Sequence, residues 1–150
     1  MSNKINMINF VANQGKERYK HFIIHGPALS GKTQMAKKLA DKLNATYIDL
    51  LADFINDSKI KNSIDIFEPQ DLKKYLRTKS DANSFIIVDN MDFLINAWDD
   101  SQLGNFLKFV ARDENKATYC FILQGNKAIL QADFASSQGQ KRVFSIYDVE

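Results

Sequence analysis

Short apolar runs alternate with amphipathic stretches along the chain. Runs of apolar residues bounded by polar or glycine-containing turns predict strands at 21–25, 46–50, 85–88, 119–123 and 143–147. Apolar residues at helical spacing predict helices at 4–14, 33–43, 51–60, 69–78, after 101, and at 127–131. This alternation predicts a single α/β domain over residues 1–150, with a mostly parallel sheet covered by helices on both faces.

The turn after the first predicted strand carries the strongest motif in the chain. Residues 26–33 read Gly-Pro-Ala-Leu-Ser-Gly-Lys-Thr, which matches the phosphate-loop pattern G-x-x-x-x-G-K-[ST] between a strand and a helix. Glycines let the backbone N–H groups turn inward around phosphate oxygens, the lysine reaches the β- and γ-phosphates, and the threonine hydroxyl faces Mg²⁺. The motif predicts a three-layer P-loop NTPase fold and binding of Mg²⁺ and ATP. The expected nucleotide contacts are Gly26, Pro27, Ala28, Leu29, Ser30, Gly31, Lys32, Thr33 and Gln34.

A second element of the same site is predicted at the end of the third strand. The apolar run Phe85-Ile86-Ile87-Val88 ends in Asp89, which is the Walker-B pattern. The carboxyl ends of parallel strands meet at one edge of the sheet, so Asp89 is expected beside Thr33 in the Mg²⁺ shell. Asp92 is a further carboxylate nearby, and its separation by two residues from Asn90 predicts that it points elsewhere.

Composition and charge restrict the classes of function. The net charge of +2 does not indicate a nucleic-acid ligand, so contact with nucleic acid is expected only through a complex. No run of 18 apolar residues and no signal-peptide pattern is present, which predicts a cytoplasmic protein that does not span a membrane. Cys120 lies in an apolar run and is expected to be a buried, inert thiol; His21 and His25 are expected to be structural.

The segment Val88-Asp89-Asn90-Met91-Asp92-Phe93-Leu94 resembles the Walker-B region of the AAA+ superfamily, and Gln124-Gly125-Asn126 is similar to its sensor-1 position. The resemblance implies a five-stranded parallel sheet of order 5-1-4-3-2. It also implies that Gln124 or Asn126 senses the γ-phosphate. Asn90 stands where this superfamily usually carries the glutamate that polarises water, and the sequence ends after the fifth strand, so the C-terminal helical lid is expected to be absent.

The Asp89-Asn90 pair and the short length also resemble the BrxF family, small P-loop proteins of bacteriophage-exclusion (BREX) systems. This resemblance implies a role in antiviral defence beside larger ATPase and methyltransferase partners. A homo-oligomer is a further possibility. Arg142, just before the fifth strand, is then a candidate arginine finger toward a neighbouring subunit, with Arg112 as a second candidate.

Three functions remain open from the sequence. The first is a nucleotide switch or weak ATPase that depends on a partner, because the amide of Asn90 cannot act as a base. The second is a small-molecule kinase, because Tyr47-Ile48-Asp49 and Asp53 after the P-loop helix are similar to the start of shikimate-kinase-like enzymes. The third is a nucleotide-binding scaffold without turnover. Ile8 or Phe10 is a candidate contact for the adenine ring, with packing on the sheet edge as the alternative.

Overall fold

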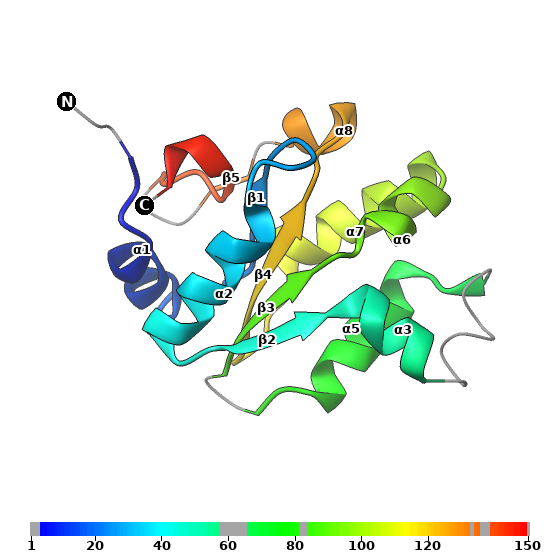
Figure 1. The fold of residues 1–150 in the computed structure, drawn as a ribbon, viewed down its shortest axis with the longest axis horizontal. Helices are drawn as coiled ribbons and strands as arrows, with labels where there is room; N and C mark the ends of the chain where they lie inside the picture. Colours follow the sequence, from blue (N-terminus) through cyan, green and yellow to red (C-terminus); the bar gives the residue numbers. More distant parts are fainter. Residues whose placement is uncertain (1–3, 58–65, 82–83, 133, 136–138, 150) are drawn as a thin grey trace.

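A five-stranded parallel sheet forms the centre of the protein (Figure 1). The computed structural model describes residues 4–57, 66–81, 84–132, 134–135 and 139–149. The strand order is β2-β3-β4-β1-β5, which is the predicted order 5-1-4-3-2. The strands are β1 (Phe22–His25), β2 (Thr46–Asp49), β3 (Phe85–Asp89), β4 (Thr118–Leu123) and β5 (Val143–Ser145).

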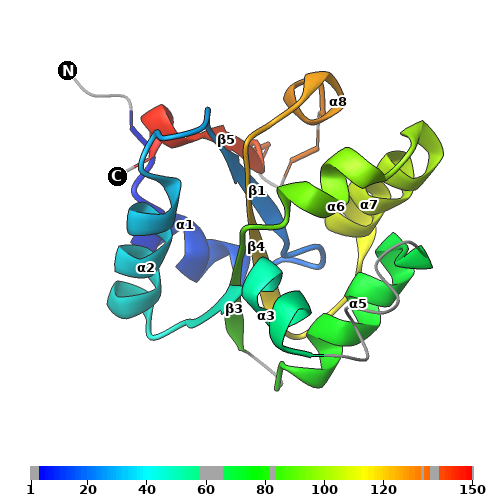
Figure 2. The ribbon, with the colours of Figure 1, turned by 45° about the vertical axis from the view of Figure 1, so that its right-hand side comes forward.

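Helices cover both faces of the sheet, as the alternating pattern predicts (Figure 2). One face packs on α1 (Met7–Gln14) and α2 (Lys32–Leu43). The other face packs on α3 (Leu50–Asn56), α5 (Pro69–Thr78), α6 (Asp92–Ala97), α7 (Asp100–Arg112) and α8 (Lys127–Leu130). Successive residues of β1 alternate between the layers: Phe22 and Ile24 contact the first core and Ile23 the second.

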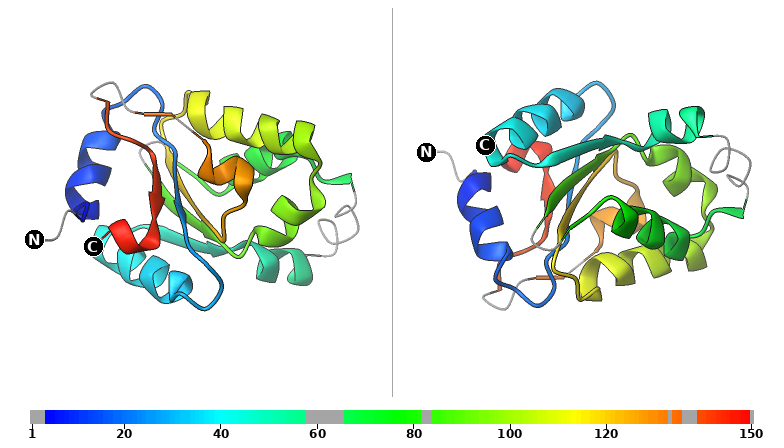
Figure 3. Two further views of the ribbon diagram at one scale, coloured as in Figure 1. Left: turned by 90° about the horizontal axis from the view of Figure 1, so that it is seen from above. Right: turned by 90° about the horizontal axis from the view of Figure 1, so that it is seen from below.

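The two ends of the described chain meet beside the first layer. The helix α1 and the 3₁₀ helix η2 (Ile146–Asp148) lie side by side in both views of Figure 3. Ile5 forms a parallel bridge with Val149, and the Ile5 N–H donates to the Asp148 carbonyl at 2.7 Å. The segment after β5 therefore closes the sheet edge against α1.

Several boundaries differ from the sequence prediction. The fifth strand ends at Ser145 rather than Tyr147, because the Ser145 hydroxyl accepts from the Tyr147 N–H and starts η2. The helix α3 ends at Asn56; the rest of the predicted helix 51–60 falls partly outside the described residues. The helix α6 is absent from the sequence prediction, since its six residues are too short for a clear helical period.

Cys120 lies fully buried in β4, as predicted. Burial raises the pKa of its thiol well above the ordinary value, so the thiol stays protonated and unreactive. In the described part of the chain, no helix has the length and apolar character needed to cross a bilayer.

Candidate functional site

The P-loop lies between β1 and α2 at the carboxyl edge of the sheet (Figure 1). Gly31 has φ +86°, a left-handed conformation that glycine adopts without strain. Gly26 is required for a different reason: a Cβ there would lie 2.6 Å from Ile146 Cγ2 and 2.9 Å from Ser30 Oγ. The loop therefore packs closely on the segment after β5.

The start of α2 is suited to bind an anion. Gly31 is its N-cap and supplies no side-chain hydrogen bond, and the first turn holds no acidic residue. The first N–H groups of a helix lack partners within the helix and carry its positive dipole end. These free donors face the space where a phosphate group would be bound.

Thr33 and Asp89 meet as the sequence predicts. The Thr33 hydroxyl donates to Asp89 Oδ2 at 2.8 Å, which joins the start of α2 to the end of β3. The Asp89 side chain accepts two further hydrogen bonds, from the Tyr47 hydroxyl to Oδ2 at 2.7 Å and from the Asn90 N–H to Oδ1 at 2.8 Å. Lys32 Nζ donates to the Pro27 carbonyl at 2.6 Å, within the loop itself. Sequence reasoning missed Tyr47 because its role depends on a contact between neighbouring strands.

A cavity of about 580 Å³ brings the two motifs together. Its walls are the P-loop with Gln34 on one side, and Asp89, Asn90, Asp92 and Gln124 on the other. Gly26 and Pro27 line an adjoining cavity of about 380 Å³, which also contains Gln124. The predicted P-loop residues, Asp89, Asn90 and Gln124 therefore lie around one continuous part of the sheet edge.

The expectation that Asp92 points elsewhere is wrong. Asp92 begins α6 and its side chain lines the same cavity as Lys32 and Thr33. Its Oδ1 accepts the Gln124 N–H at 2.9 Å, which links the ends of β3 and β4. Burial raises the pKa of the Asp92 carboxyl, against the lowering effect of the Gln124 hydrogen bond and of Lys32. Two carboxylates, rather than one, therefore face the P-loop.

Asn90 adopts a left-handed backbone conformation with φ +57°. Asparagine and aspartate tolerate this region better than other residues that carry a Cβ. The Asn90 side chain is half-buried and lines the cavity, so it occupies the predicted position without a carboxylate.

Gln124 and Asn126 have different environments. Gln124 is exposed at the end of β4 and lines the cavity beside Lys32. Asn126 is the N-cap of α8, and its Oδ1 accepts the Ile129 N–H at 3.0 Å. Since the Asn126 side chain is already used by the helix end, Gln124 is the better candidate for contact with a γ-phosphate.

The structure contradicts the expectation that Arg142 is an arginine finger. Its side chain is 1% exposed and lies within the protein. The guanidinium donates to the carbonyls of His21, Val110 and Ala111 at 2.7, 3.2 and 2.8 Å. Two of these carbonyls belong to the last turn of α7, so Arg142 caps that helix. Arg112, the second candidate, is exposed at the end of α7.

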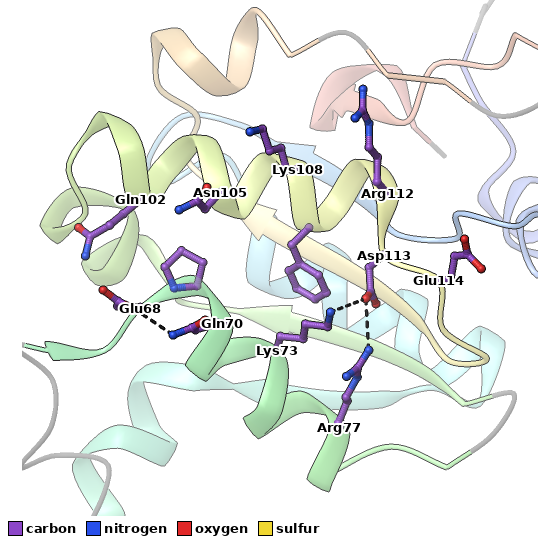
Figure 4. Close-up of a pocket in the computed structure, with 12 residues that line it drawn as sticks. Glu68, Gln70, Lys73, Arg77, Gln102, Asn105, Lys108, Arg112, Asp113 and Glu114 are labelled. Atoms are coloured by element: carbon purple, nitrogen blue, oxygen red, sulfur yellow. Dashed lines mark hydrogen bonds and ion pairs between the residues drawn. The ribbon is translucent and has the colours of Figure 1, made fainter.

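A separate cavity of about 570 Å³ lies between α5 and α7 (Figure 4). Lys73 and Arg77 from α5 both reach Asp113 Oδ1, at 3.1 and 3.3 Å. The other oxygen of Asp113 lies 2.9 Å from Nε2 of the fully buried His21, and His21 Nδ1 accepts the Tyr119 N–H at 3.0 Å. These ion pairs and hydrogen bonds join α5, the end of α7 and the residue before β1, so His21 has the structural role predicted for it.

Phe10 and Ile8, the two candidates for contact with the adenine ring, lie in different environments. Phe10 is buried and its ring contacts Phe22 and Phe144 edge to face, at 4.9 Å between centroids. Ile8 is 49% exposed and lines a cavity of about 500 Å³ with Ser30, Gly31 and Gln34. Of the two candidates for contact with a nucleobase, only Ile8 reaches the surface beside the P-loop.

The sheet order, the loop before α2 and the Thr33–Asp89 contact define a P-loop nucleotide-binding protein. The model of the ATPase family associated with various cellular activities (AAA) matches residues 22–143, and the chain belongs to this family. A comparison with curated proteins found no match.

Proposed function

We propose that the protein binds Mg²⁺-ATP at the carboxyl edge of the sheet and acts as a nucleotide switch or weak, partner-dependent ATPase. The observation that carries the proposal is the convergence of Lys32, Thr33 and Asp89 around one cavity in which position 90 is an amide. Lys32 and Thr33, together with the free N–H groups at the start of α2, supply the charge and the hydrogen-bond donors for the phosphates.

The donor set fits a magnesium ion bound together with a nucleotide. Mg²⁺ usually keeps several waters and takes one or two carboxylates plus substrate phosphates. Asp89 and the Thr33 hydroxyl would hold it here, and they already contact one another. Bound Mg²⁺ would neutralise charge that develops on the β- and γ-phosphate oxygens. For the base, the cavity beside Ile8, Gly31 and Gln34 offers an apolar wall next to the P-loop.

Slow turnover follows from the groups around the phosphates. The Asn90 amide cannot accept a proton from water, and positioned general bases contribute about 10²–10⁴-fold. Asp92 is the remaining carboxylate of the cavity besides Asp89. Burial raises the pKa of the Asp92 carboxyl, which favours acceptance of a proton, but its Oδ1 is bonded to the Gln124 N–H. Gln124 would contact the γ-phosphate or its attacking water.

The test combines binding and turnover on the purified protein. Calorimetry should show Mg²⁺-ATP binding to the wild type and its loss in a folded Lys32→Ala variant. Phosphate release by the wild type should be slow, and Asn90→Asp should accelerate it, since aspartate keeps the left-handed backbone. Brisk hydrolysis by the isolated wild type would make the protein an ordinary ATPase, and equal binding by wild type and Lys32→Ala would remove the P-loop assignment.

A place in a bacterial defence assembly of the BREX type is a further part of the proposal. It is supported by the resemblance of the Asp89-Asn90 pair to the BrxF family. Larger ATPase and methyltransferase subunits, or further copies of this chain, would then complete the site, with nucleic acid reached through the complex. Copurification from the native host, with nucleotide analysis of the recovered complex, tests this: recovery without such partners contradicts it.

Of the alternatives, a scaffold without turnover is favoured by the amide at position 90. It predicts ATP binding with no phosphate release, alone or with partners. The kinase alternative needs an arginine near the transferred phosphate, and all four arginines of the chain are described. None lines the Lys32 cavity: Arg18 pairs with Glu114, Arg77 with Asp113, Arg142 caps α7 and Arg112 is exposed.

A further inference from the structure

Tyr47 reaches the Walker-B aspartate from the neighbouring strand. Residues of β2 and β3 pair in parallel register, with Tyr47 opposite Ile87 and Asp49 opposite Asp89. The Tyr47 side chain packs in the same core layer as α2, and its hydroxyl extends to Asp89 Oδ2 at 2.7 Å. The phenol therefore contacts the same oxygen that accepts the Thr33 hydroxyl at 2.8 Å.

The hydrogen bonds of Asp89 leave little freedom to its carboxylate. An ionised carboxylate has about four acceptor positions. Tyr47 and Thr33 occupy two on Oδ2, and the Asn90 N–H occupies one on Oδ1. The Asp89 residue is 3% exposed, so water does not compensate for a missing donor. The acceptor position that remains is on Oδ1, and Asp89 lines the cavity together with Lys32 and Thr33.

The environment of Tyr47 keeps it a hydrogen-bond donor. The phenol donates its hydroxyl hydrogen to Asp89 Oδ2 at 2.7 Å, and a tyrosine hydroxyl is protonated at neutral pH. Lys37 Nζ from α2 lies 5.6 Å from the centre of its ring, which holds the half-buried ring against α2. The phenol thus supplies a neutral donor that does not compete with a metal ion for the charge of Asp89.

We propose that Tyr47 is a positioning residue for the magnesium site, which orients the Asp89 carboxylate so that its free acceptor position serves the metal shell. The inference rests on the proposed Mg²⁺-ATP function. The Thr33 hydroxyl donates its hydrogen to Asp89 and retains its lone pairs for the metal, while the Tyr47 hydroxyl donates to the same carboxylate oxygen. Without the phenol hydroxyl, the Asp89 carboxylate could take more than one orientation while it keeps its remaining hydrogen bonds.

The experiment compares Tyr47→Phe with the matched variant Tyr75→Phe. Tyr75 is also half-buried, and its hydroxyl donates to an aspartate, Asp53 Oδ2, at 2.5 Å. It does not line the P-loop cavity. Calorimetry measures the dissociation constant of ATP in Mg²⁺ and in EDTA, and the ratio of the two constants reports the contribution of the metal. Thermal unfolding of each variant without nucleotide measures the loss of stability that both share.

In Tyr47→Phe we expect the Mg²⁺-dependent gain in affinity to fall about fivefold or more, with ATP affinity in EDTA within about twofold of wild type. A hydrogen bond to a charged group accounts for a loss of this order. Tyr75→Phe should leave both constants unchanged. The role of Tyr47 is overturned, while the metal site stands, by any of three results. These are an unchanged ratio of the two constants in Tyr47→Phe, an equal fall of the ratio in both variants, or an equal fall of ATP affinity in Mg²⁺ and in EDTA. If the wild type binds ATP without any effect of Mg²⁺, the proposed metal site and the role of Tyr47 both fall.

Discussion

Replacement of Arg142 by methionine tests whether this arginine stabilises the fold or acts on a neighbouring subunit. Methionine keeps an unbranched apolar side chain in the core and removes every hydrogen-bond donor. In the structure the guanidinium joins the start of β1, through the His21 carbonyl, to the last turn of α7, through the Val110 and Ala111 carbonyls. Its charge also lies 4.8 Å from the centre of the Phe134 ring.

The expected loss of stability follows from the acceptors left behind. The His21 and Val110 contacts are buried and the Ala111 contact is partly buried. A buried acceptor without a partner costs about 1–3 kcal/mol, and the partly exposed carbonyl can bind water. Two buried carbonyls give a loss of about 2–6 kcal/mol. Because the buried guanidinium no longer has to be desolvated, the expected net loss is about 2–4 kcal/mol. Domains of this size unfold with about 5–15 kcal/mol, so a large part of the stability is removed.

Urea unfolding followed by circular dichroism measures this loss. With a slope of about 2 kcal/mol per molar, the midpoint should fall by about 1–2 M. The matched control is Arg112→Met, because Arg112 lies exposed at the end of the same helix, and it should change the unfolding free energy by less than about 0.5 kcal/mol. If Arg142→Met unfolds like wild type but abolishes hydrolysis when mixed with wild-type subunits, the capping role is refuted and the arginine-finger hypothesis is restored.

Three shorter predictions concern Asp89, the P-loop and the buried His21–Asp113 contact. Asp89→Asn should reduce ATP affinity in Mg²⁺ by at least tenfold but not in EDTA, measured by calorimetry; an equal effect in both buffers would exclude a metal role. Leu29 has a fully exposed side chain and a left-handed backbone with φ +62°. Because only glycine relieves the left-handed strain, the unfolding free energy of Leu29→Gly in urea should be about 1 kcal/mol higher than that of Leu29→Ala. Burial lowers the pKa of His21 below its ordinary value of 6.5. Burial alone would raise the pKa of Asp113, but the hydrogen bonds from His21 and Lys73 hold the pKa of this carboxyl below its ordinary value of 3.8. The unfolded chain therefore binds more protons, and the unfolding free energy should fall as the pH drops below about 6.5; a constant or rising value from pH 7.5 to 5.5 would contradict this.

The parts of the site that sequence predicts are those fixed by local chain geometry. The P-loop pattern needs a strand, a tight turn and a helix in direct succession, and all its residues lie within one such unit. Asp89 follows an apolar run that must be a buried strand, and the carboxyl ends of parallel strands share an edge. The meeting of Thr33 with Asp89 is therefore encoded by motif and sheet type together.

The contacts that sequence does not predict depend on side-chain direction between distant elements. Arg142 lies before β5, where the sequence suggests a candidate arginine finger, but carbonyls at the end of α7 bind its guanidinium inside the protein. Asp92 faces the cavity because the short helix α6 begins there and the Gln124 N–H holds its carboxylate. Tyr47 reaches Asp89 only through the register of β2 against β3. No periodicity in the chain carries these three relations.

The amide at position 90 and the carboxylate at position 92 have a common structural explanation. The chain leaves β3 through a left-handed residue, Asn90 at φ +57°, so that the Asn90 N–H can turn back to Asp89 Oδ1. A glutamate there would have to hold the same conformation at a cost of about 1–2 kcal/mol, which asparagine reduces through local hydrogen bonding. The left-handed turn also starts α6 two residues later, which directs Asp92 into the cavity. The geometry that orients Asp89 thus disfavours a glutamate at position 90 and brings the Asp92 carboxylate into the cavity. Under the proposed function, the hydrogen bond of Asp92 to the Gln124 N–H must be broken or rearranged before this carboxylate can accept a proton from water.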